Sequence, residues 1–89
     1  MKKVEHIGIA VRDLSESESL FTALLGTEPY KRETVEKEAV ITSFFKTGDT
    51  KIELLESTNE EGPIARFLEK RGEGIHHIAF EVEDIRAKM

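Results

Sequence analysis

Residues 4–14, VEHIGIAVRDL, and residues 75–85, IHHIAFEVEDI, are two altered copies of one stretch of sequence. A His, an Ile, a Val and an Asp recur at the same places, and four further positions match in kind. The alternation of apolar residues is typical of a β-strand, and His6 and His77 stand at equivalent points, 71 residues apart. The repeat therefore predicts a duplicated module with paired histidines, of which the chain holds one copy and the beginning of a second.

The composition bounds the class of protein. A chain of 89 residues makes one small domain, and 38% hydrophobic residues gathered in periodic runs indicate that it folds. The absence of cysteine excludes disulfides and thiolate metal sites. A net charge of −5 argues against nucleic acid as a partner. No apolar run approaches the roughly 20 residues of a membrane span or forms the core of a signal peptide, so we expect a cytoplasmic protein without a membrane partner.

Periodicity and turn residues predict the order β-α-β-β-β, then a linker helix, a strand and the start of a further helix. Ser15 and Glu18 have the spacing of a capping box that begins the first helix, and Gly26 ends it. Its apolar stripe is Leu20, Phe21, Leu24 and Leu25. The expected segments are strand 3–12, helix 15–25, extended runs 28–35 and 39–46, a hairpin partner at 51–55, a helix from Pro63 to before Gly72, a strand from Gly74 and a helix from Asp84.

His6 and His77 are the first candidates for chemistry. A single His in a strand is most often structural, but modules that pair about a pseudo-twofold axis bring equivalent positions together. Two neutral imidazoles that face each other are best explained by a shared metal ion. His76 follows the strand alternation to the other face, so we do not expect it to be a ligand.

Glu53 is the third candidate. In the strand around it, Ile52 and Leu54 face one side, so Glu53 faces the other. On a solvent-facing side it would be an ordinary surface carboxylate, but if this side lines the concave face of the module, a buried carboxylate needs a cation. The repeat period places its symmetric partner at about position 124, beyond Met89. Glu56 lies on the wrong face and is interpreted as a surface residue.

Three motifs carry a family resemblance: HIGIAVRDL at 6–14, KIELLE at 51–56 and GEGIHHIAFEV at 72–82. Together they resemble the vicinal oxygen chelate superfamily and, within it, the methylmalonyl-CoA epimerases. The resemblance implies an α+β fold, in which paired βαβββ modules curl around one divalent metal ion. Residues 1–74 then form the first module with its linker helix, and residues 75–89 begin the second.

The resemblance also implies a site and a reaction. His6, Glu53 and His77 would be three of four ligands to Zn, Co, Mn or Ni, and the fourth would be a Glu beyond Met89. The implied reaction interconverts (R)- and (S)-methylmalonyl-CoA through removal of the proton α to the thioester, with an enolate that the metal stabilises. An acyl-CoA is the implied partner and a homodimer the implied assembly.

One position departs from the family pattern. Some members carry a catalytic Glu on the third strand, where this chain has Thr42, which cannot act as a carboxylate base. Either another group acts as this base, the alignment at this strand differs, or the activity differs. The other acid/base, a carboxylate, is expected beyond Met89. Candidate groups for the phosphates of CoA are the basic residues Lys2, Lys3, Arg12, Lys31 and Arg32.

Three alternatives to the epimerase remain open at this stage. A glyoxalase I-like lyase acting on a glutathione adduct would use similar metal geometry, and a drug-sequestering module would use the same fold without metal chemistry. An incomplete fragment without activity is the third: a strand at 75–83 left unpaired would expose its edge and apolar face. We expect a protein of about 130–140 residues from the repeat period.

Overall fold

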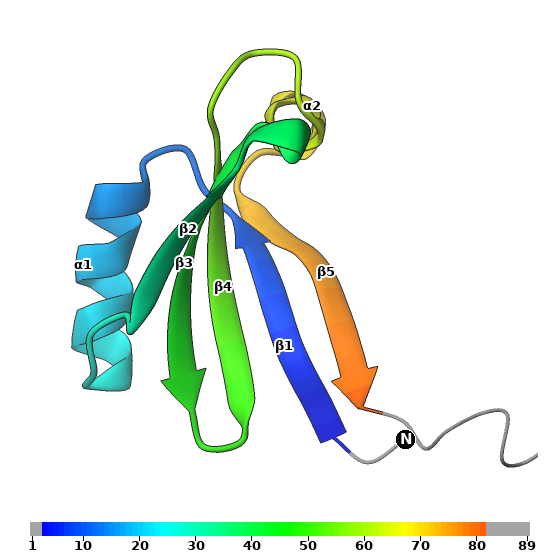
Figure 1. Ribbon diagram of the computed structural model, residues 1–89. Coiled ribbons are helices and arrows are strands. Elements are labelled where there is room, and N and C mark those ends of the chain that lie inside the picture. Colours follow the sequence, from blue (N-terminus) through cyan, green and yellow to red (C-terminus); the bar gives the residue numbers. More distant parts are fainter. Residues whose placement is uncertain (1–2, 82–89) are drawn as a thin grey trace, which may run out of the picture.

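The structure is a computed structural model that describes residues 3–81, and one mixed sheet organises it. Five strands lie in the order β2-β3-β4-β1-β5 (Figure 1). The elements are β1 (Lys3–Ala10), α1 (Leu14–Leu25), β2 (Lys31–Val35), a short 3-10 helix (Glu36–Glu38), β3 (Val40–Thr47), β4 (Thr50–Ser57), α2 (Pro63–Arg71) and β5 (Gly74–Glu81). This confirms the α+β class and the predicted element order as far as β5. The helix expected from Asp84 lies outside the described residues.

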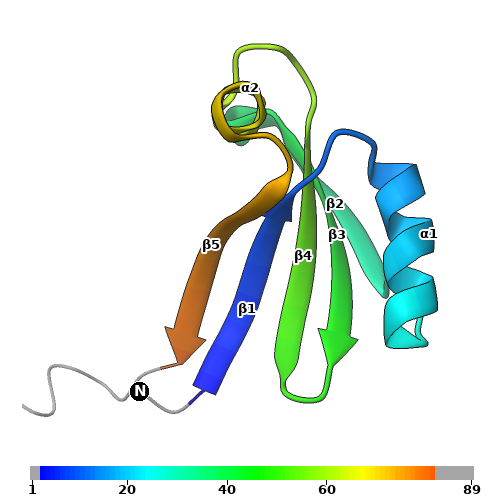
Figure 2. The ribbon, with the colours of Figure 1, turned by 180° about the vertical axis from the view of Figure 1, so that it is seen from behind.

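Strand β1 holds the first copy of the repeat and pairs directly with β5, which holds the second. It pairs in parallel with β4 and antiparallel with β5, so β1 and β5 run side by side in opposite directions (Figure 2). The expectation that the strand from residue 75 stays unpaired is therefore wrong: β5 finds its backbone partner in β1. Its apolar side chains Ile75, Ile78 and Phe80 do remain between 45% and 58% exposed.

Helix α1 covers one face of the sheet. Leu14 packs there with Phe45 and Leu54, which are both 0% exposed, and Phe21 and Leu25 border the same cluster. These helical positions recur at i, i+7 and i+11 and form one narrow stripe. Leu20 and Leu24 were predicted to belong to it, but they lie beside the stripe and are 58% and 68% exposed.

The start of α1 also differs from the prediction. The N-cap is Asp13, whose side chain accepts a hydrogen bond of 2.9 Å from the backbone N–H of Glu16. Ser15 lies inside the helix, so it cannot open a capping box. Glu18 instead turns toward the sheet, where its carboxylate accepts bonds from Arg32 at 2.7 Å and from the buried Ser43 hydroxyl at 2.6 Å. The Glu18 carboxylate thus binds Arg32 and Ser43 on the sheet and does not cap the start of the helix.

Glu56 was interpreted as a surface residue, and the structure gives it a role at the same helix end. Its Oε2 accepts a hydrogen bond of 3.0 Å from the backbone N–H of Leu14. The first residues of a helix have N–H groups without intrahelical partners. Glu56 therefore ties the first turn of α1 to strand β4.

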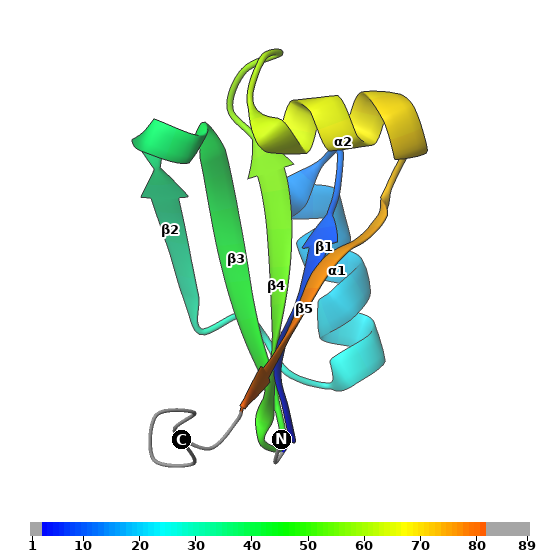
Figure 3. The ribbon, with the colours of Figure 1, turned by 90° about the vertical axis from the view of Figure 1, so that its right-hand side faces the viewer.

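Helix α2 lies across one end of the sheet, on the face opposite α1 (Figure 3). Its residues Ile64 and Leu68 pack on Ala10, Val40 and Leu55, all at most 8% exposed. We call the rest of that face, beyond the cover of α2, the open face. It carries the side chains that share the register of Leu55, among them Thr42, Phe44, Lys51 and Glu53, together with His6, Gly8 and His77. No helix in the described range 3–81 is long and apolar enough to cross a bilayer.

Candidate metal centre

His6 on β1 and His77 on β5 meet on the open face. The antiparallel register pairs Gly8 with His77 and His6 with Ala79, which is the symmetric arrangement that the repeat predicts. The two Nε2 atoms are 3.1 Å apart, and the rings meet edge to face at 85° with centroids separated by 5.1 Å. Two residues from opposite ends of the sequence thus aim the same ring nitrogen at one point.

Glu53 completes the group from the neighbouring strand. Its partner across the β1–β4 ladder is Gly8, which has no side chain to separate Glu53 from the histidines. One ligand atom from each of His6, Glu53 and His77 lies within 4.8 Å of the others. The side chains of His6 and Glu53 are only 22% and 16% exposed, so the carboxylate lies in a half-buried setting that favours a cationic partner.

The distances fit a divalent ion. Nitrogen and oxygen ligands lie about 2.0–2.2 Å from such an ion, so two ligand atoms of one site are at most roughly 4.3 Å apart. The separation of the two Nε2 atoms, 3.1 Å, is inside that limit. Oε2 of Glu53 lies 3.8 Å from Nδ1 of His6, and the three candidate ligand atoms lie within 4.8 Å of one another. Two imidazoles and one carboxylate suit Zn, Co, Mn or Ni. The structure brings the three predicted residues together, and their role as ligands is a proposal.

Gly8 makes room for the ring of His77. A Cβ atom at position 8 would lie 2.2 Å from Cε1 of His77 and 2.6 Å from each ring nitrogen. No side-chain atom fits there, because real contacts of this kind are longer than 3.0 Å. The small residues two places after each histidine, Gly8 and Ala79, were the sequence signal for this close approach.

The ladder between β1 and β5 is interrupted immediately before each histidine. Its register shifts between Val4 and His6 and again between Gly8 and Ile9, which leaves Glu5 and His76 as extra residues. Such bulges re-aim side chains. The prediction that His76 points to the other face is wrong for this reason: its Nδ1 lies 2.9 Å from Nδ1 of His77.

Glu5 holds the other histidine. Its Oε1 hydrogen bonds to Nδ1 of His6, and its Oε2 lies 3.2 Å from Nζ of Lys51. These two contacts, the bond to His6 first, lower the pKa of Glu5 and keep it ionised. The pKa of His77 is lowered chiefly by burial and then by the neighbouring His6 and His76, so His77 stays neutral, the form that binds metals.

Comparison with known proteins places the chain. Residues 5–89 match the model of the glyoxalase/bleomycin resistance protein/dioxygenase superfamily. The chain belongs to this superfamily.

Two relatives and one solved structure show how far the likeness extends. The uncharacterized protein YqjC of Bacillus subtilis is 42% identical over 80 residues, which are 90% of this chain and 57% of YqjC. The ethylmalonyl-CoA/methylmalonyl-CoA epimerase of Cereibacter sphaeroides is 42% identical over 86 residues, 96% of this chain and 64% of the epimerase. A Streptomyces coelicolor methylmalonyl-CoA epimerase variant in complex with 2-nitronate-propionyl-CoA superposes with a TM-score of 0.82 at 34% identity, covering 99% of this chain and 67% of that one. The chain thus spans about three fifths of the length of these curated relatives.

Thr42 is the residue expected to stand where some epimerases carry a catalytic Glu. It lies on the open face with 5% exposure, opposite Leu55 on β4 and Glu33 on β2. Its hydroxyl is no base at neutral pH. The acid/base carboxylate predicted beyond Met89 lies outside the described residues.

The basic residues considered for CoA phosphates are in different settings. The guanidinium of Arg32 is paired with Glu18, and Lys31 lies over the ring of Phe44, with Nζ 4.9 Å from its centroid. Lys3 contacts Glu81 and the backbone of Asp49, and Lys2 lies outside the described residues. Lys31 shares the register of the open face, because its cross-strand partner Phe44 is in turn the partner of Glu53.

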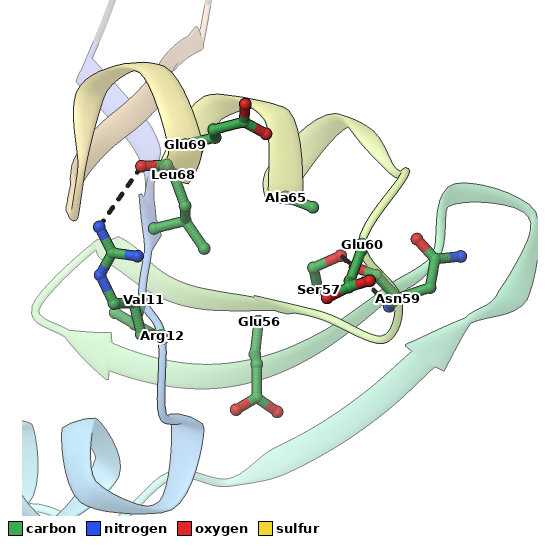
Figure 4. A pocket seen from close by; sticks show the side chains of 9 residues that line it. All are labelled: Val11, Arg12, Glu56, Ser57, Asn59, Glu60, Ala65, Leu68 and Glu69. Carbon is green, nitrogen blue, oxygen red and sulfur yellow. Dashed lines mark hydrogen bonds between the residues drawn. The ribbon is translucent and has the colours of Figure 1, made fainter.

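Arg12 lines a pocket beneath α2, away from the three candidate ligands (Figure 4). There the guanidinium donates to the carbonyl of Leu68 at 3.4 Å. The carboxylates of Glu56, Glu60 and Glu69 line the same pocket. Their charge repels phosphate, so this pocket is a poor place for the phosphates of CoA.

Proposed function

We propose that the protein is a metal-dependent epimerase that interconverts (R)- and (S)-methylmalonyl-CoA. The observation that carries the proposal is the cluster of His6, Glu53 and His77, with ligand atoms within 4.8 Å of one another. The names of the relatives support the substrate: a protein called ethylmalonyl-CoA/methylmalonyl-CoA epimerase is 42% identical over 96% of this chain. A related epimerase was solved with an acyl-CoA compound.

The chemistry requires stabilisation of negative charge. Removal of the proton α to a thioester places charge on the carbonyl oxygen, and preorganised positive charge at that atom is the largest catalytic effect expected. A divalent ion, when bound, supplies that charge as a Lewis acid. His6, Glu53 and His77 hold it at the open face, beside Phe44 and Lys51, where the substrate can approach.

The described residues on the open face supply binding and not the proton transfers. Thr42 cannot remove the α-proton, and Glu53 is committed to the cation. An epimerisation needs an acid and a base on opposite faces of the reacting carbon. We infer that these groups come from outside the described residues, in a second module that begins at residue 75. A cytoplasmic location and a homodimer are further predictions of the family resemblance.

The test follows a single epimer of methylmalonyl-CoA in D₂O by NMR, with the full-length protein. We expect loss of the α-proton signal and appearance of the other epimer, arrested by a chelator and restored by added metal. Glu53→Ala is expected to lower the rate at least about 100-fold. Glu38→Gln, an exposed carboxylate in the turn after β2, is the matched control and keeps the wild-type rate.

A second substrate separates the alternatives. The glutathione adduct of methylglyoxal is offered under the same conditions. Turnover of this adduct alone would overturn the epimerase in favour of a glyoxalase-type enzyme. Turnover of neither compound by metal-loaded protein would overturn both and indicate a binding module.

A further inference from the structure

The two bulge residues occupy equivalent places in the repeat. Glu5 precedes His6 and His76 precedes His77, and the two copies of the repeat align them. Each is the extra residue of a register shift in the β1–β5 ladder. Each also contacts the Nδ1 atom of the histidine that follows it. The same local device therefore occurs twice, once on each side of the site.

With Nδ1 engaged in each ring, the Nε2 atoms of the two histidines point at each other. In both rings the Nδ1 atom forms a hydrogen bond with the bulge residue, while the two Nε2 atoms face each other at 3.1 Å. Nδ1 of His6 also lies 3.8 Å from Oε2 of Glu53, which is farther than a hydrogen bond. An imidazole binds metal through one nitrogen, and the hydrogen bond at the other nitrogen selects its tautomer.

We propose that Glu5 and His76 are positioning residues, which fix the ring orientation and tautomer of His6 and His77 so that both Nε2 atoms are directed at one metal ion. This inference rests on the metal site of the proposed function. Neither residue touches the ion in this arrangement.

Glu5 and His76 differ in the hydrogen bonds that they can form. An ionised carboxylate only accepts hydrogen bonds, so Glu5 requires a proton on Nδ1 of His6 and keeps its Nε2 bare. Lys51, 3.2 Å from the other oxygen, holds the carboxylate in place. His76 can either donate or accept at Nδ1, and its ring is packed edge-on against Phe67 of α2, with centroids 5.1 Å apart. Glu5 thus fixes His6, whereas His76 can follow a change of tautomer in His77.

This difference suits the two states of the site. Without metal, the contact between the Nε2 atoms needs one proton, and because Nε2 of His6 is bare, His77 carries it. With a divalent ion held by His6, Glu53 and His77, Nε2 of His77 would lose that proton to solvent. His77 would take up a proton on Nδ1 and donate a hydrogen bond to Nδ1 of His76, which accepts when its own proton is on Nε2. His76, which can either donate or accept, therefore contacts His77, the histidine whose tautomer must change.

The test measures tautomers and metal affinity separately. Long-range ¹H–¹⁵N NMR on the full-length protein reports which nitrogen of each imidazole carries the proton. We expect His6 to be protonated at Nδ1 in both metal-free and Zn²⁺-loaded protein, and His77 to move its proton from Nε2 to Nδ1 on loading. Calorimetry with Zn²⁺ gives the affinity.

Three variants separate the positioning role from charge alone. Glu5→Ala is expected to mix the tautomers of His6 and to weaken Zn²⁺ binding about 10- to 100-fold. Glu5→Gln removes the charge but retains an oxygen acceptor, so it is expected to preserve the tautomer and most of the affinity. His76→Ala is expected to weaken binding to a similar extent, without changing the tautomer of His6.

Several outcomes would overturn the proposal. Glu5→Gln behaving like Glu5→Ala in tautomer and affinity would show that the charge is the whole effect. An unchanged His6 tautomer in Glu5→Ala would show that Glu5 does not select it. A metal-shifted nitrogen on His76 would make that residue a ligand. If wild-type protein binds no metal, the proposed function fails, whereas the His6 tautomer in metal-free protein still tests the role of Glu5.

Discussion

The two faces of the sheet are built from the same strands but differ in the burial and polarity of their side chains. On the α1 face, Phe45 and Leu54 are 0% exposed in an apolar cluster. On the open face, their strand neighbours Phe44 and Glu53 are partly exposed, and Glu53 lies beside two imidazoles. Strand alternation alone divides the side chains between the faces. The difference indicates that the α1 face is a packed core, whereas the open face, beyond the cover of α2, is left free for binding.

Removal of a core side chain on the α1 face is the strongest test of this division. Phe45→Ala is expected to lower the free energy of unfolding by about 3–5 kcal/mol, because it leaves a cavity among Leu14, Leu54 and Phe21. Urea denaturation measures the loss. Leu20→Ala, on the same helix but 58% exposed, is expected to change stability by at most about 0.5 kcal/mol. Equal losses in both variants would contradict the packing described for α1.

A small change on the open face is expected to weaken metal binding and leave the stability of the fold almost unchanged. Gly8→Ala places a Cβ 2.2 Å from Cε1 of His77 and displaces that ring. We expect Zn²⁺ affinity to fall at least about tenfold, while the strand itself gains slightly from losing a glycine. Calorimetry and thermal unfolding measure the two effects.

Gly74→Ala is the matched control, since a Cβ there meets nothing within 4 Å. It is expected to bind Zn²⁺ like the wild type. If Gly8→Ala also binds normally, the close approach of His77 to β1 is not part of the site.

Glu18 provides the smallest expected effect, and it depends on pH. Its pKa is lowered below 4.5 chiefly by the hydrogen bond from Arg32, an effect partly offset by burial. A lowered pKa in the folded state stabilises the protein above the ordinary pKa, and that contribution is lost as pH falls through the folded value. Glu18→Gln is therefore expected to cost about 1 kcal/mol at neutral pH.

The cost of Glu18→Gln is expected to shrink as the pH falls below about 4.5. Urea unfolding of both proteins at neutral pH and at about pH 3.5 measures the change. A difference that stays constant over this range would show that the charge of Glu18 contributes nothing.

Much of the fold could be predicted from the sequence, because regular elements carry regular patterns. The alternation around Ile52 and Leu54 placed Glu53 on the face opposite the α1 core, and the structure confirms it. The repeat predicted that His6 and His77 would meet, since an antiparallel pair about a local twofold places equivalent residues together.

The missed features depend on departures from regularity or on distant partners. A bulge breaks the two-residue period, so alternation sent His76 to the wrong face and gave Glu5 no role. Glu18 fitted a local capping pattern, but Arg32 and Ser43 compete for it from strands that the sequence does not place beside the helix. Strong local patterns thus predicted the elements, while the connections around the site needed three-dimensional structure.

The central claim is that His6, Glu53 and His77 hold one divalent ion, and anomalous diffraction tests it most directly. Crystals of the full-length protein are grown with Co²⁺ or Zn²⁺, and data are collected at the absorption edge of the metal. We predict one anomalous peak on the open face, within bonding distance of Nε2 of both histidines and of a carboxylate oxygen of Glu53. A peak at another place, or none at saturating metal, would contradict the account.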